Sequence, residues 1–197
     1  MKKPAATNIM KNLFTALFAL IIAPIMSGQE LTKKEFNQIF IETGKIRELI
    51  LNGNVEQIGE LLQINDLENF EEFKSMFTNQ ELSFNSVSEH TYAHPYFYLT
   101  DKENIIDLTI PAMKILSKRS GEDYERGRYY FVLKASIKYN WDDKTVNFEN
   151  QKLITGDKEI EEWWLGNWKN YVPEIVKVSD KFGFKGPPPL CPPENLR

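Results

Sequence analysis

The stretch from Arg128 to Asn140 alternates between apolar and polar side chains, and this alternation constrains the fold more than any other feature of the chain. The apolar members would share one face of an extended backbone: Tyr129, Phe131, Leu133, Ala135, Ile137 and Tyr139. The other face would carry Arg128, Lys134, Ser136 and Lys138 together with Tyr130 and Val132. A period of two indicates a β-strand with one face on a core. Asp142-Asp143 then predicts a turn, and a partner strand is marked by Val146, Phe148 and Ile154.

Residues 104–119, "NIIDLTIPAMKILSKR", leave two interpretations open. Alternating apolar residues favour a strand as far as Ile110. Pro111 opposes an unbroken helix, because it lacks a backbone donor and its ring clashes with the preceding turn. We therefore expect a strand up to Ile110, followed either by a short helix that opens at Pro111 or by another strand.

The residues before this region have the period of helices. Thr32 and Glu35 stand three apart in "LTKKEF" and predict a capping box at a helix start. Apolar spacings of three and four follow, at Phe36, Ile39, Thr43, Ile46 and Ile50. Asn52-Gly53 ends this helix. A second helix is expected after Asn54 and a third over residues 66–77.

A further short helix is expected near the end of the chain, capped by Asp157 and running through "KEIEEWWLGNW". Ile160, Trp164 and Trp168 would share one of its faces, which favours core packing. The whole pattern predicts an α+β fold in which N-terminal helices precede a mostly antiparallel, curved β-sheet. We expect a single domain over residues 29–182.

The end of the chain, residues 183–197, is rich in proline and predicts an extended, poorly ordered tail. It contains the single cysteine, Cys191. One cysteine cannot form an internal disulfide, so the hydrophobic core must hold the fold. No basic neighbour marks the thiol as reactive.

Residues 1–28 have the order of a secretory signal peptide. Lys2, Lys3 and Lys11 precede a mostly apolar run over residues 13–26, and Ser27-Gly28 follows it. We expect cleavage after Gly28 and an exported, periplasmic or secreted protein that is not an integral membrane protein. The whole chain has a net charge of −4 and no basic run, so nucleic acid is an improbable partner by composition.

Both histidines of the chain lie in "SEHTYAHPYFYLT", residues 88–100. Pro95 favours an extended backbone at the residue before it, and the aromatic residues favour a strand. One face of that strand would be apolar. The other would carry the candidate ligand-binding residues, His90, Tyr92, His94, Tyr96 and Tyr98. Aromatic rings with polar tips suit a binding surface.

The same spacing argues against a metal site at these histidines. Four residues of a strand span about 13 Å, which is too far for two imidazoles to share one ion. The sequence also has no nucleophile elbow and no glycine-rich phosphate loop, so we predict no cofactor and name no catalytic residues.

Two hypotheses of function follow. The first is a non-catalytic exported module that binds a protein or a small ligand through the tyrosine- and histidine-rich strand face. The alternative is a small exported hydrolase that uses His90 or His94 with a distant carboxylate.

Overall fold

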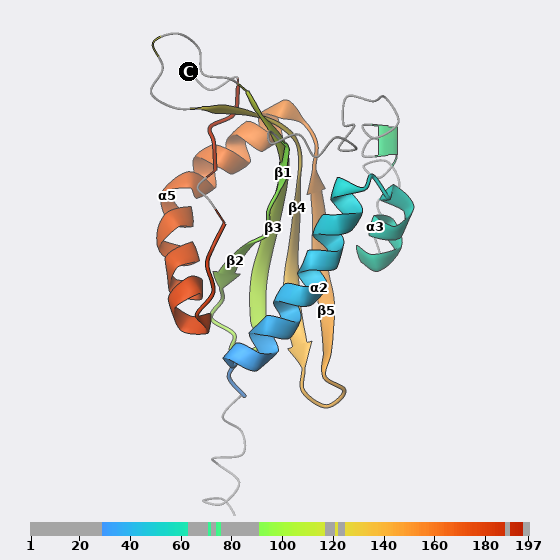
Figure 1. The fold of residues 1–197 in the computed structure, drawn as a ribbon, viewed down its shortest axis with the longest axis vertical. Helices are drawn as coiled ribbons and strands as arrows, with labels where there is room; N and C mark the ends of the chain where they lie inside the picture. The colour runs from blue at the N-terminus through green and yellow to red at the C-terminus, as the bar shows by residue number, and fades with distance from the viewer. Residues whose placement is uncertain are drawn as a thin grey trace, which may run out of the picture. The chain divides into compact units, whose positions relative to one another are not determined.

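An antiparallel β-sheet lies at the centre of the fold, with helices packed on it (Figure 1). The computed structural model describes residues 29–62, 71, 74–75, 91–116, 121, 125–187 and 190–194. Residues 31–197 form one compact unit. N-terminal helices precede the sheet, which is open and visibly curved in Figure 1, so the predicted α+β class is confirmed.

Within the described residues the sheet has five strands, and all of their pairings are antiparallel. They are β1 (Thr91–Ala93), β2 (Tyr96–Leu99), β3 (Ile105–Leu116), β4 (Arg126–Asn140) and β5 (Thr145–Ile154). Strands β1 and β2 both pair with β3, β3 pairs with β4, and β4 pairs with β5. The predicted hairpin of β4 and β5 is therefore present.

The region with two interpretations is one continuous strand. β3 passes through Pro111 and extends to Leu116, so no helix opens there. The register aligns Ala93 with Ala112 and Tyr96 with Thr109, which places His94-Pro95 opposite Ile110-Pro111. Because proline has no N–H group for the ladder, this alignment explains why the edge strand is divided into β1 and β2.

Helix α2 (Lys33–Leu51) begins at the predicted capping box. The backbone N–H of Lys34 donates to Thr32 Oγ1 at 3.2 Å, and the N–H of Thr32 donates to Glu35 Oε2 at 3.1 Å. Together these bonds satisfy donors that a helix start leaves unpaired. α3 (Val55–Leu62) follows, as expected. Most of the predicted third helix lies outside the described residues, although Glu71, Lys74 and Ser75 are helical.

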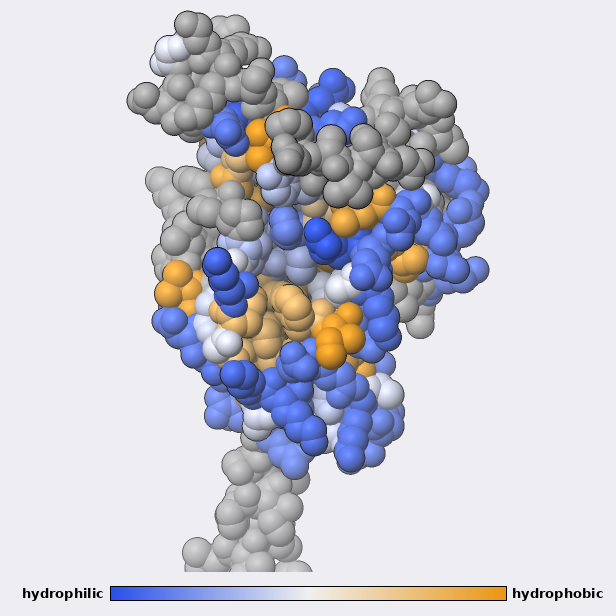
Figure 2. Space-filling view, viewed as in Figure 1, coloured by the Kyte–Doolittle hydropathy of each residue, from blue (hydrophilic) through white to orange (hydrophobic). Residues whose placement is uncertain are grey.

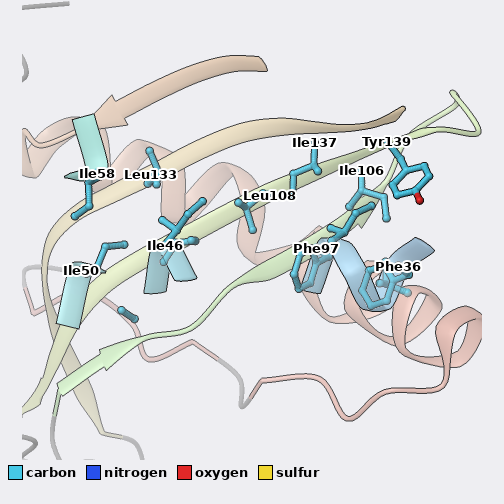
Figure 3. Close-up of a cluster of buried hydrophobic side chains, with 14 of the residues drawn as sticks. Phe36, Ile46, Ile50, Ile58, Phe97, Ile106, Leu108, Leu133, Ile137 and Tyr139 are labelled. Carbon is cyan, nitrogen blue, oxygen red and sulfur yellow. The ribbon is translucent and has the colours of Figure 1, made fainter. Parts of the chain in front are cut away.

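Helices α2 and α3 cover one face of the sheet, which we call the inner face. Its apolar side chains form a large core with Phe36, Ile46 and Ile58 of the helices (Figure 3). The sheet contributes the inner-face residues Ala93, Phe97, Ile106, Leu108, Ile110, Ala112, Phe131, Leu133, Ile137 and Tyr139.

Helix α5 (Asp157–Phe182) is far longer than the short helix that the sequence predicts, and Gly156 rather than Asp157 is its N-cap. Its first turns pack Ile160 and Trp163 on the opposite, outer face of the sheet. There they form a second apolar cluster with Tyr96, Met113, Tyr129, Val132, Ile154 and Leu190. The sheet therefore has apolar cover on both faces.

The last turn of α5 returns to α2. The Phe182 ring stacks on the Phe36 ring, with centroids 4.2 Å apart and planes 4° from parallel. Phe97 of β2 meets the Phe36 ring edge-on at 5.2 Å. Phe40 and Phe184 pack nearby, and hydrophobic side chains are visible in this region between α2 and α5 (Figure 2).

A β-bulge in β4 places Tyr129 on the face opposite to the predicted one. Ala112 pairs with Phe131 but Met113 pairs with Tyr129, so Tyr130 is an extra residue in the ladder. Residues from Phe131 onward keep the predicted alternation. Tyr129 instead moves to the outer face, where it joins the second cluster.

The sequence predicts a poorly ordered proline-rich tail, but part of this tail packs against the sheet. Leu190 is 3% exposed, and the N–H of Gly127 donates to Pro192 O at 2.9 Å. The Tyr129 hydroxyl donates to the carbonyl of Cys191. A Cβ at Gly127 would lie 3.1 Å from the Met113 sulfur, so glycine permits this close approach.

We predict that Phe36→Ala destabilises the fold by about 3–5 kcal/mol, because it empties the contact between α2, β2 and α5. Phe40→Ala is the matched control on the same helix. Phe40 is 42% exposed, so we expect a loss of about 1 kcal/mol. Urea unfolding followed by circular dichroism measures both changes. Equal losses in the two variants would contradict the central role of Phe36.

Candidate functional site

Three of the five candidate ligand-binding residues share the outer face of the sheet. Tyr92 pairs with Met113, Tyr96 with Thr109 and Tyr98 with Asp107, so the tyrosines alternate with inner-face residues as the sequence predicts. His90 lies outside the described residues. Sharing a face does not give the three tyrosines the same environment.

Tyr96 lies inside the second apolar cluster and is 1% exposed. Burial raises the pKa of its phenol strongly, with a smaller contribution from nearby Cys191. The Tyr96 ring is therefore a core residue. Tyr92 and Tyr98 are half-buried at the margin of the same cluster, where they remain partly accessible.

His94 lies at the break between β1 and β2 and is half-buried. Its ring centroid is 5.5 Å from that of Tyr92. Burial lowers the pKa of His94, and the positive charge of Arg47 on α2 lowers it further. Both effects favour the neutral imidazole. Among the residues that the structure describes, no carboxylate hydrogen-bonds to His94, and the hydrolase hypothesis stays a prediction because His90 is not described.

A pocket opens on the outer face beside the second cluster and has a volume of about 330 Å³. Tyr98 is the candidate residue that lines it. The polar residues around it come from β3, β4 and β5: Asp107, Thr109, Lys134, Ser136, Asn150 and Lys152. Convergent polar groups in a pocket can fix the orientation of a small molecule, and this lining is more polar than that of most small-molecule sites.

One hydrogen bond organises the polar wall of this pocket. Ser136 Oγ donates to Asp107 Oδ1 at 2.8 Å, across the pair of strands β3 and β4. The two residues are direct partners in the register, so the sheet itself sets their separation. The bonded pair offers a fixed carboxylate oxygen and a hydroxyl to a ligand.

A second β-bulge shapes the far side of the pocket. Ser136 pairs with Glu149 but Lys134 pairs with Lys152, so β5 contains an extra residue between them. Asn150 lies in this segment with φ of 54°, a left-handed conformation that asparagine adopts more readily than most residues. Val146 and Phe148 face the inner core, and Leu153 rejoins it beyond the bulge.

Sequence reasoning missed most of the residues that line the pocket. The alternation of β4 predicts a polar strand face for Lys134 and Ser136 but no site, and Asp107 stands alone within an apolar run. The register of three strands brings these side chains together, and no local motif indicates that register. The isolated carboxylate of "IIDLTI" was the one available signal.

Within the described ranges, no group of three or more His, Cys, Asp or Glu side chains is placed to hold a metal ion. No helix in that part of the chain is long and apolar enough to cross a membrane. Comparisons with known protein families, with curated proteins and with solved structures find no match.

We predict that the lowered pKa of His94 makes folding less favourable in mild acid. The unfolded chain takes up a proton near the ordinary pKa of 6.5, whereas the folded chain does so at lower pH. Stability is therefore lost as pH falls from about 7 through the folded pKa. Urea unfolding between about pH 7 and pH 5 should show a smaller loss for His94→Gln than for the native chain.

His90→Gln is the matched control for this measurement, since it removes the other histidine. An identical pH dependence in the native chain and His94→Gln would contradict the assigned shift.

Proposed function

We propose that the chain is an exported, non-catalytic binding module that holds a small polar ligand in the outer-face pocket. The observation that carries the proposal is the pocket itself, because it contains Tyr98 from the predicted binding strand and polar residues of three neighbouring strands. A binding role needs shape and hydrogen-bonding groups, and the pocket offers both. Export rests on the signal-like order of residues 1–28.

The position of the pocket supports binding to a preformed site. Its walls are β-strands paired through many residues, and Thr109 beneath it is 3% exposed. A sheet fixes the backbone positions of the site residues before a ligand arrives. Tyr98 adds an aromatic surface for the apolar part of a ligand.

We predict that filling the pocket abolishes binding. Ser136→Tyr places a bulky ring in the pocket, whereas Asn147→Tyr places the same ring outside it, on the exposed part of β5. A library of neutral, cationic and anionic polar molecules is screened against the isotope-labelled protein by NMR. Ligands should shift the amide signals of residues 107–109 and 134–136 in the native chain and in Asn147→Tyr.

In Ser136→Tyr the affinity for these ligands should fall at least tenfold. Failure of every class of molecule to perturb the pocket would overturn the proposal. So would equal loss of binding in both variants.

Export has a separate test. Expression of the full chain in a bacterium, followed by fractionation and intact mass analysis, should give an exported protein that begins at Gln29. A cytoplasmic protein that retains residues 1–28 would contradict export and would leave the proposed pocket unaffected.

A further inference from the structure

Two lysines lie side by side in the lining of the pocket. Lys134 of β4 and Lys152 of β5 are direct partners in the register, and both side chains line the pocket. Like charges directly opposite one another in a sheet are destabilising. The whole chain is acidic, with a net charge of −4, so this pair is not part of a generally basic surface.

Within the described part of the chain, neither ammonium group forms an ion pair or a hydrogen bond. The nearest pocket carboxylate, Asp107, accepts its hydrogen bond from Ser136. Lys138, the next lysine on the same face of β4, lies 3.9 Å from Glu149. The pocket therefore contains two ammonium groups and one carboxylate.

Another basic pair in the same sheet shows how such a conflict is relieved. Lys114 and Arg128 are also direct partners in the register. The ring of Tyr130 lies beneath both, 5.7 Å from Lys114 Nζ and 5.6 Å from Arg128 Cζ. An aromatic face attracts each cation and offsets their repulsion. No described aromatic ring takes this position at Lys134 and Lys152.

The bulge at Asn150 is what brings the pocket lysines together. Continuing the pairing of Ser136 with Glu149 without an extra residue would align Lys134 with Gln151, which is uncharged. The bulge replaces that partner with Lys152. A left-handed asparagine and a repelling pair both cost free energy, and features of this kind often mark functional sites.

From these observations we infer that the pocket binds a small organic anion, whose carboxylate or phosphate group is held between the ammonium groups of Lys134 and Lys152. This inference rests on the proposed binding function and names its ligand class. The Asp107–Ser136 pair faces the hydroxyl or amino groups of the ligand, and Tyr98 contacts its body. A lysine acts as a point charge, so the pair accepts either type of anion.

Four molecules with a hexose body provide the test. Glucose 6-phosphate and glucuronate carry the two anionic groups, glucose carries no charge, and glucosamine carries a cation. Inorganic phosphate is added as the anion without a body. Affinities are measured by calorimetry, and amide shifts at residues 134 and 152 locate the site. At least one anion should bind tenfold more tightly than glucose and weaken as salt rises.

Three substitutions distinguish anion binding by Lys134 and Lys152 from a general effect of positive charge on the sheet. Lys134→Gln and Lys152→Gln should each lower anion affinity at least tenfold, whereas Lys138→Gln on the same face should change it less than twofold. Without ligand, Lys152→Gln should raise the urea midpoint, since it removes the repulsion. That rise shows that loss of binding in the variant is not loss of folding.

Each outcome decides between the two proposals. The anion that binds more tightly shows whether the pocket prefers a phosphate or a carboxylate group. Binding of glucose or glucosamine in the pocket, with no preference for any anion, would overturn the anion assignment and leave the binding function standing. Equal losses in all three lysine variants would also overturn the assignment. Absence of pocket shifts with every probe, together with a blank library screen, would overturn both.

Discussion

The contact of Phe36 with Phe182 and Phe97 fixes the path of helix α5, and the rest of the structure depends on that path. α5 starts on the outer face, where it buries Ile160 and Trp163, and ends in the core of the inner face. It therefore covers the outer face incompletely. The pocket lies on this outer face, beside the cluster that the first turns of α5 complete.

The sequence predicted those features that a local pattern determines. Thr32 and Glu35 marked the start of α2, and the alternation from Phe131 to Tyr139 placed those residues on the correct face. The predictions failed where a contact between residues distant in sequence determines the face or the burial of a side chain. Tyr129 changes face at a bulge, and Tyr96 is buried because the first turns of α5 pack on its face of the sheet. A tyrosine on an exposed strand face and one beneath a helix look identical in sequence.

The candidate site was predictable in part for the same reason. Tyr98 was named from its strand, but Lys134 and Lys152 become partners through the extra residue near Asn150. No glycine in the sequence indicates the position of that bulge. A shift of one residue there changes every pairing beyond it. Strand register brings together residues that are far apart in sequence. A single sequence contains no pattern that reveals this proximity.

The division of the first edge strand at His94-Pro95 has a consequence for association between copies of the protein. The outer edge of a sheet presents unpaired backbone groups on which a foreign strand can grow. Here that edge consists of segments of three and four residues, separated by a proline that offers no donor. An incoming strand would lose its ladder after a few bonds, so the break protects this edge of the sheet from fibril-like growth.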